Sequence, residues 1–377
     1  MIPLSLYIHI PWCIRKCPYC DFNSHQSPDT LPEAQYIQAL ISDLDHDVAQ
    51  FSHQPIQSIF IGGGTPSLFS AQSYATLFTA IQKQLPFAND IEITLEANPG
   101  TVDQDRFRDY RALGINRLSL GIQSFNPLHL QRLGRIHDEK QAHRAIDSAR
   151  YAGFDNINID IMHGLPGQSI AESLQDLQTG LAHAPEHISW YELTIEPNTV
   201  FYKTKPVLPS DDDAHIMEEE GFALLQEHAY QRYEISAFSR PNRQARHNLN
   251  YWLFGDYYGI GAGAHGKLTT HDTTQVYRTR KQRQPNDYLN PSKPYLAACD
   301  EVNRHDLIFE FMLNATRLEQ AIPTSLFTQR TGLPYADLVP LLQQAEQKGL
   351  VNIQETHWQI TPLGRRYTND FQAIFII

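Results

Sequence analysis

The stretch Cys13-Ile14-Arg15-Lys16-Cys17-Pro18-Tyr19-Cys20 holds three of the four cysteines of this 377-residue chain, in a C-x-x-x-C-x-x-C spacing. It follows directly on the apolar segment Leu4 to Ile10, whose alternation predicts a strand. Thiolates this close in sequence can converge on one metal centre if the loop wraps it, and three sulfurs leave one position of a tetrahedral site open. The loop therefore predicts a metal centre with room for an outside ligand.

Three interpretations fit this spacing. A structural zinc site would need a fourth ligand, which Cys299 or one of the 17 histidines could supply, but the usual pair of C-x-x-C knuckles is absent. A disulfide framework suits secreted proteins, whereas a chain of this length with four cysteines and no secretory segment is expected to keep its thiols reduced. The third interpretation, which the spacing favours, is an iron–sulfur cluster with three cysteine ligands and one open iron.

The cysteine loop after a first strand resembles the signature of the radical S-adenosylmethionine (SAM) superfamily. The flanking stretches Tyr7–Cys13 and Cys17–Phe22 resemble the oxygen-independent coproporphyrinogen III oxidase family, and the likeness runs over nearly the whole chain. The resemblance implies that Cys13, Cys17 and Cys20 hold a 4Fe–4S cluster, with SAM on the open iron. It also implies that Tyr7 and Tyr19 flank the cluster.

Charge and hydropathy limit the classes of partner. The chain has 30 basic and 42 acidic residues, a net charge of −12, which argues against a nucleic-acid backbone as the main partner. No basic n-region precedes an apolar segment, and no apolar run is long enough to span a bilayer. We expect a cytoplasmic protein without a transmembrane segment.

The order of periodic segments predicts the fold. Strand patterns at 58–61, 91–97, 117–121, 156–161 and 187–194 alternate with helical patterns at 71–85, 103–113, 139–152 and 170–183. Such alternation predicts right-handed crossovers and a parallel sheet with ligands at the carboxyl ends of the strands. Together with the resemblance it predicts an α/β radical SAM partial (β/α) barrel over residues 1–240, followed by a heme-motif segment and linker over 241–300.

Residues 301–377 are expected to form a small helical domain of winged-helix-like shape. Helical patterns at 307–313, 324–331 and 338–348 precede a hairpin pattern around Glu355-Thr356. DNA-binding modules share this shape, but fold does not set function and the acidic balance opposes DNA binding. We expect a cap domain, with the apolar end 371–377 packed on the core or on a partner.

Two strand ends carry candidate SAM-binding residues. Adjacent glycines after the strand at 58–61 let the backbone approach a ligand, although the same pattern suits an ordinary tight turn. The resemblance implies that Gly63, Gly64 and Thr65 contact the methionine end of SAM. Glu96 stands at the rim of the next strand, where a carboxylate is usually only solvated, and the resemblance implies that it binds SAM.

Three further residues match family positions that line SAM sites: Gln123, Arg135 and Asp160. A carboxylate such as Asp160 can accept hydrogen bonds from a ribose, and the guanidinium of Arg135 can meet a carboxylate in bidentate fashion. A salt-bridge network around the barrel mouth is the alternative for these residues.

The stretch His247-Asn248-Leu249-Asn250-Tyr251-Trp252 is the candidate heme segment. A lone histidine beside aromatic residues is most often packed with both nitrogens satisfied. The stretch resembles, however, the H-N-x-x-Y-W motif of the heme-chaperone branch of the family, which implies heme bound through His247, with His265 as the nearest rival ligand. The basic cluster Arg278–Arg283 is either a solvated loop or a partner for porphyrin or membrane anions.

Two functions compete on this scaffold. One is a heme chaperone that keeps cluster and SAM and transfers heme to acceptor proteins, including membrane-associated respiratory proteins; a homodimer is compatible with it. The alternative is anaerobic oxidative decarboxylation of coproporphyrinogen III. The oxidases have a further cysteine where this chain has Phe22 and an extension before the cluster loop, whereas only 12 residues precede Cys13 here. We therefore expect the chaperone, without coproporphyrinogen oxidase activity.

Overall fold

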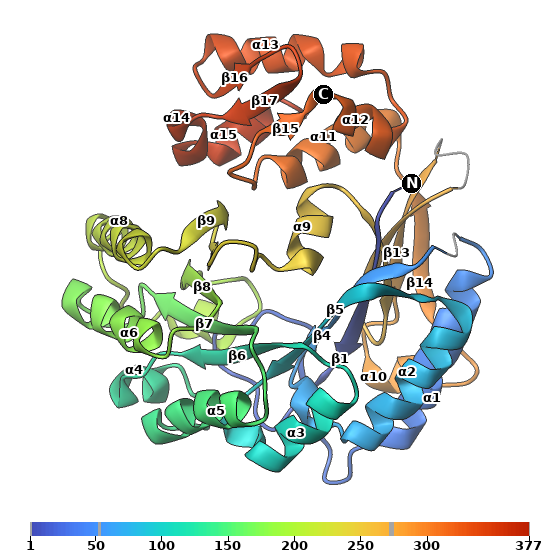
Figure 1. Cartoon of the computed structure of the whole chain (residues 1–377), viewed down its shortest axis with the longest axis vertical. Helices are drawn as coiled ribbons and strands as arrows, with labels where there is room; N and C mark the ends of the chain where they lie inside the picture. Colours follow the sequence, from blue (N-terminus) through green and yellow to red (C-terminus); the bar gives the residue numbers. More distant parts are fainter. Residues whose placement is uncertain (1, 52–53, 271–274, 377) are drawn as a thin grey trace.

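The computed structural model describes residues 2–51, 54–270 and 275–376, and a twelve-stranded sheet is its framework (Figure 1). The strand order is β14-β13-β12-β11-β1-β4-β5-β6-β7-β8-β10-β9. Its strands are β1 Leu4–Ile10, β4 Ile56–Gly63, β5 Phe87–Ala97, β6 Arg117–Gln123, β7 Ile157–His163, β8 His187–Glu192, β9 Gln231–Glu234, β10 Ala237–Ser239, β11 Asp256–Ile260, β12 His265–Thr269, β13 Val276–Lys281 and β14 Leu296–Glu301.

Helices cover the convex side of this sheet, as the blue and green helices of Figure 1 show. The helices that precede the C-terminal domain are α1 Glu33–Val48, α2 Ala71–Gln84, α3 Gln104–Ala112, α4 Pro127–Arg132, α5 Glu139–Tyr151, α6 Ile170–Ala182, α7 Val200–Thr204, α8 Asp211–Glu227, α9 Arg246–Trp252 and α10 Pro285–Tyr288. The connections β1-α1-β4-α2-β5-α3-β6 repeat one β-loop-α unit, which confirms the alternation predicted from the sequence.

Seven neighbouring strands are parallel, from β11 through β1 and β4 to β8. Side chains alternate between the two faces of each strand. In β1, Leu4, Leu6 and Ile8 join the apolar core under the helices, whereas Tyr7 and His9 point to the concave face. The fold thus buries its apolar face against helices and keeps a polar concave face.

Antiparallel strands extend the sheet at both edges. Beyond β11 follow β12, β13 and β14, and beyond β8 follow β10 and β9. The sequence pattern at 233–238 predicts one strand, but the chain bends at residues 235–236 and forms the short pair β9 and β10 instead. The basic cluster expected as a loop is mostly strand β13.

A separate apolar core holds the C-terminal domain together, drawn in orange to red in Figure 1. Its elements are α11 Arg304–Ala315, β15 Ile322–Pro323, α12 Thr324–Thr331, α13 Val339–Gln347, β16 Val351–Ile353, β17 His357–Ile360, α14 Pro362–Arg366 and α15 Thr368–Ala373. The predicted hairpin is β16–β17, and β15 adds a third strand. Phe371 and Phe375 are fully buried in this core, as expected for the apolar end, whereas Ile376 is exposed and residue 377 lies outside the described residues.

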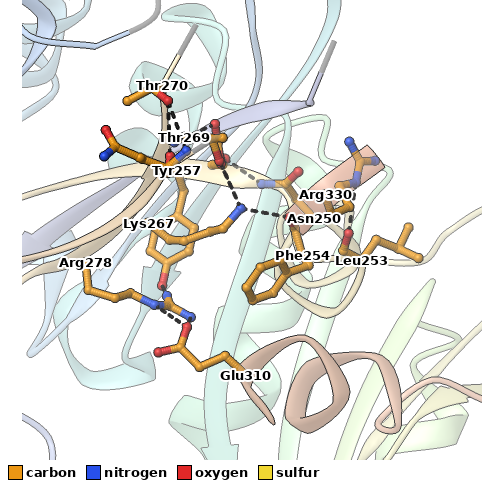
Figure 2. A network of polar contacts seen from close by, with 12 residues as sticks. Asn250, Leu253, Phe254, Tyr257, Lys267, Thr269, Thr270, Arg278, Glu310 and Arg330 are labelled. Atoms are coloured by element: carbon orange, nitrogen blue, oxygen red, sulfur yellow. Dashed lines mark hydrogen bonds and ion pairs between the residues drawn. The ribbon is translucent and has the colours of Figure 1, made fainter. Parts of the chain in front are cut away.

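Polar contacts attach this domain to the sheet (Figure 2). Arg278 of β13 pairs with Glu310 of α11 at 2.7 Å, and its Nη1 donates to the Tyr257 hydroxyl at 2.9 Å. Nearby, the buried Lys267 ammonium lies 2.9 Å from the Asp256 carboxylate. The Arg278–Glu310 pair joins β13 to α11 and so helps to fix how the domain docks on the sheet, whereas the buried Lys267–Asp256 pair lies within the sheet, between β12 and β11.

Candidate functional site

The cysteine loop closes on itself between β1 and α1. The two-residue strands β2 Trp12–Cys13 and β3 His25–Gln26 pair in parallel, so they join the ends of the loop. Inside it, the Lys16 ammonium donates to the carbonyls of Phe22 and Ser24 at 3.0 and 3.1 Å. The loop therefore wraps as the spacing predicts.

All three loop cysteines line one cavity of about 420 Å³ on the concave side of the sheet. Cys13, Cys17, Cys20 and Cys299 are free thiols, and Cys299 is exposed away from this cavity. Within the described residues, no three His, Cys, Asp or Glu side chains come close enough together to hold a single metal ion. The thiols thus stand around the cavity rather than at one point.

The candidate cluster donors around the cavity are three thiols, with one guanidinium beside them. Burial raises the pKa of the Cys13 and Cys20 thiols, so a metal centre would have to deprotonate them, as thiolate coordination ordinarily does. Arg135 Nη1 lies 3.7 Å from Cys17 Sγ and supplies a positive charge beside the sulfurs. Three soft donors with a cation at their side fit a sulfur-ligated iron cluster.

The glycine turn at the end of β4 packs directly against the cysteine loop. Gly63 has a φ of +112°, and a Cβ there would lie 2.5 Å from the His9 ring. A Cβ on Gly64 would lie 2.5 Å from the Trp12 carbonyl oxygen, while the N–H of Thr65 donates to that oxygen at 2.7 Å. These residues line the cavity and also have a structural task, which is to let β4 approach the loop.

Two carboxylates face the same cavity from β5 and β7. Burial, with the nearby Asp160 charge, raises the pKa of Glu96 to about 8, and Glu96 Oε2 accepts the Gly63 N–H at 3.1 Å. Burial also raises the pKa of Asp160, whose oxygens accept from Asn158 Nδ2 at 2.8 Å and Ser119 Oγ at 3.2 Å. A positively charged ligand between them would relieve this repulsion.

Arg135, Gln123 and Tyr19 complete the wall of the cavity. Arg135 Nη2 donates to the Gly121 carbonyl at 2.6 Å, and Gln123, at a φ of +69°, accepts the Tyr191 hydroxyl at 2.6 Å. Burial raises the pKa of Tyr19 and keeps its hydroxyl protonated. The structure thus brings together, around one cavity, every predicted cluster and SAM residue except Tyr7.

The sequence reasoning missed a polar layer at the inner end of this cavity. Arg117, Asn158 and His187 line it, and the Arg117 side chain is 2% exposed with its Nε lacking a hydrogen-bond partner among the described residues. His187 bonds Asn158 Oδ1 at 2.6 Å and the Tyr233 hydroxyl at 2.8 Å. The alternation Asn156-Ile157-Asn158-Ile159-Asp160 was the available signal, because every second residue is polar on one face.

The predicted heme segment forms helix α9, and its histidine lies outside both large cavities. His247 is 2% exposed, its Nε2 lies 2.7 Å from the Tyr251 hydroxyl and its Nδ1 lies 3.4 Å from Ser58 Oγ. Its ring stacks on Phe60 at 5.1 Å between centroids. Burial, with the charge of Arg117, lowers the pKa of His247 to about 3, so the imidazole stays neutral.

Other residues of α9 reach the cavities in place of His247. Asn248 and Trp252 line the cysteine cavity. Tyr251, one helical turn after His247, lines a second cavity of about 840 Å³. Tyr7, predicted beside the cluster, also lines this second cavity, where its hydroxyl lies 2.9 Å from His9 Nδ1.

The second cavity adjoins the first, because Phe22, Gly63 and Glu96 line both. It lies over β1, β11, β12 and β13, and its walls carry aromatic rings and cations. Its lining includes three tyrosines, one histidine and two arginines: Tyr7, Tyr251, Tyr257, His265, Arg280 and Arg283.

Comparisons with known proteins identify the family of the chain. Residues 7–179 match the Radical SAM superfamily, and residues 302–367 match the HemN C-terminal domain. The chain is 48% identical to the heme chaperone HemW of Escherichia coli strain K12, covering 99% of this chain and 98% of that protein. It is also 48% identical to HemW of Haemophilus influenzae strain KW20, with the same coverage of both chains.

A solved structure shows the same fold. Coproporphyrinogen III oxidase (HemN) from Escherichia coli, described as a radical SAM enzyme, superposes with a TM-score of 0.83 at 25% identity, over 99% of this chain and 90% of that one. The likeness confirms the predicted partial barrel with its C-terminal domain. Within the described residues, no helix is long and apolar enough to cross a membrane. The chain belongs to the HemW heme chaperone family of radical SAM proteins.

Proposed function

We propose that this chain is a heme chaperone, which binds heme and hands it to acceptor proteins, including membrane-associated respiratory proteins reached from the cytoplasm. The observation that carries the proposal is the position of α9: the segment His247–Trp252 lies between the cysteine cavity and a larger aromatic, cationic cavity. Relatives 48% identical over nearly their whole length are named heme chaperones. A homodimer is compatible with this function.

The first cavity is proposed to hold the resident cofactors. Cys13, Cys17 and Cys20 would hold a 4Fe–4S cluster, since all three thiols line one cavity. When bound, the cluster offers SAM an open iron and an electron. Arg135, from its place beside Cys17 Sγ, would stabilise the negative charge of the thiolates.

SAM is proposed to lie between the glycine turn and the two carboxylates. Gly63, Gly64 and Thr65 would border its amino-acid end, where Glu96 offers an acceptor for a cationic group. Asp160 would face the ribose hydroxyls. Hydrogen bonds from Ser119 and Asn158, one to each of its oxygens, fix the orientation of this carboxylate. Gln123 is held by Tyr191 on the same wall.

Heme is proposed to be cargo rather than a resident group. Tyr251 and Tyr257 offer aromatic faces to a macrocycle, and arginines of the second cavity offer partners for its propionates. His247 contributes to this site indirectly, because its ring is hydrogen-bonded to the hydroxyl of Tyr251. For His247 itself to bind the iron, as the motif suggests, the ring would have to release that hydroxyl.

The competing function is coproporphyrinogen III oxidation, which the likeness to HemN favours. One experiment separates the two. The protein, purified without oxygen and with its cluster reconstituted, is titrated with heme and, separately, incubated with coproporphyrinogen III, SAM and a reductant. A stoichiometric heme spectrum without porphyrin product supports the chaperone, whereas product formation at catalytic turnover would replace it with the oxidase.

A further inference from the structure

We propose that the second cavity is the heme site and that His265, at the start of β12, is the axial ligand of the heme iron. The proposal rests on the heme-chaperone function and adds to it the location of the cargo and the atom that binds it. Nothing in the sequence favoured His265 over His247. Hydrogen bonding and burial separate the two.

An iron ligand needs a ring nitrogen with a free lone pair that faces an open space. Of the histidines near the heme segment, His247 has both nitrogens engaged and lies outside the cavity. His9 lines the cavity, but Tyr7 and the Asn23 carbonyl occupy its two nitrogens, at 2.9 and 3.0 Å. The ring nitrogens of His247 and His9 are therefore already engaged by other groups of the protein.

His265 meets both requirements. Its side chain is exposed and lines the second cavity. Within the described parts of the chain, neither of its ring nitrogens has a hydrogen-bond partner. Partial burial, together with Arg280 and Arg278, lowers the pKa of His265, which favours the neutral imidazole that metals bind.

The sheet register sets cations beside this imidazole. His265 of β12 stands directly opposite Arg280 of β13, and cross-strand partners present their side chains on the same face. Arg280 pairs with Asp300 only at the surface, at 3.2 Å with both side chains more than half exposed, so this pair is weak and can open. Arg283 follows in the same wall, with only a 3.4 Å contact to Asn23.

The shape of the cavity suits a flat macrocycle. Tyr7 of β1 is in register with Gly259 of β11, and Gly259 lies against the backbone of His265, so β11 contributes no side chain at the position between Tyr7 and His265. Phe22 lies at the border of the two cavities and is 64% exposed. Water is a poor environment for its apolar ring, so this ring marks a surface suited to an apolar ligand. A volume of about 840 Å³ lies in the range of sites that enclose a ligand of this size.

The histidine pair provides the first experiment. Cluster-reconstituted wild type, His265→Ala and His247→Ala are titrated with heme without oxygen, and ligation is read by the Soret band and by resonance Raman of the iron–histidine mode. We expect His265→Ala to lose the histidine signature and about tenfold or more in affinity, and added imidazole to restore the signature. His247→Ala should keep the signature even where its affinity falls, because it releases Tyr251 and Ser58 but leaves His265 in place.

Outcomes that overturn the proposal are distinct from failure of the chaperone function. If wild type binds heme but His265→Ala keeps an unaltered spectrum and affinity, the ligand assignment fails while the function stands. Loss of an imidazole-restorable signature in His247→Ala would move the ligand to α9. Absence of stoichiometric heme binding by wild type would reject the proposed function itself. Cluster iron and circular dichroism report the fold of each variant.

The arginines provide a second, independent test. The double variant Arg280→Ala/Arg283→Ala should bind heme about tenfold more weakly but bind heme dimethyl ester, which lacks charged propionates, with unchanged affinity. The double variant Arg108→Ala/Arg366→Ala, at exposed arginines of α3 and α14 that do not line the cavity, controls for the loss of two positive charges. Equal losses for both ligands, or none for heme, would contradict the placement of the propionates.

Discussion

The two cavities share one wall and differ in the strands that build them. The cysteine cavity lies at the carboxyl ends of parallel strands and carries thiols and carboxylates, whereas the second cavity lies over β1, β11 and the antiparallel strands β12 and β13 and carries aromatic rings and arginines. Gly63 and Glu96 border both. The difference teaches that one sheet can offer carboxylates to a positively charged ligand at its parallel strands and arginines to a negatively charged ligand at its antiparallel edge.

The largest effect should come from the thiols. The triple variant Cys13→Ala/Cys17→Ala/Cys20→Ala should lose all cluster iron and sulfide, because no other soft donors line that cavity among the described residues. Iron and sulfide analysis after anaerobic reconstitution measures this, with Cys299→Ala as the matched control that keeps the full content. Heme affinity should survive in the triple variant; its loss would mean that the two cavities are one site.

A large effect on stability should come from the wall of the second cavity. Lys281 is fully buried, with its ammonium 2.5 Å from Asp43 and 2.7 Å from Asp47 of α1. Lys281→Ala leaves two carboxylates without their cation and should lower the free energy of unfolding by about 3–5 kcal/mol. Denaturant titration measures it.

The control for this experiment is Lys293→Ala, which removes an ion pair of similar length, 2.7 Å to Asp287, from the surface. It should cost less than about 1 kcal/mol, because solvent screens exposed pairs. Similar values for the two variants would show that the buried triad does not fix β13 to α1.

Glu96 lines both cavities, so a variant at this position tests the wall that the two cavities share. At pH 9, where its carboxyl is ionised, Glu96→Ala should weaken SAM binding by about 2 kcal/mol, since it removes a charge-assisted acceptor from the cavity. Calorimetry on the reconstituted protein measures the dissociation constant, and Glu355→Ala in the exposed hairpin turn is the control. Cluster content should not change. An unaltered SAM affinity would place SAM away from β5.

The smallest effect concerns pH. Because burial and Asp160 raise the pKa of Glu96 to about 8, its carboxyl is mostly protonated at pH 7 and ionised at pH 9. The positively charged sulfonium of SAM favours the ionised form, so the ratio of wild-type to Glu96→Gln affinity should rise about tenfold between these values. The ratio cancels any titration of SAM itself. A flat ratio would mean that Glu96 keeps one protonation state throughout.

Much of the molecule follows from local sequence. The spacing of Cys13, Cys17 and Cys20 predicts a wrapped loop, and alternating strand and helix patterns predict the parallel sheet, because these features depend on neighbours a few residues apart. Gly63 and Glu96 were found at strand ends for the same reason. In the C-terminal domain, the period of apolar residues predicted the helices and the β16–β17 hairpin.

Other features were decided only by tertiary contacts. Lys281 belongs to a run of basic residues that looks solvated in sequence, yet it meets Asp43 across a separation of 238 positions. The sequence motif favours His247 over His265, but packing engages both nitrogens of His247 and leaves His265 facing a cavity. The physical reason is that periodicity fixes which face of a strand or helix a side chain occupies, whereas the register between distant strands fixes what that face meets.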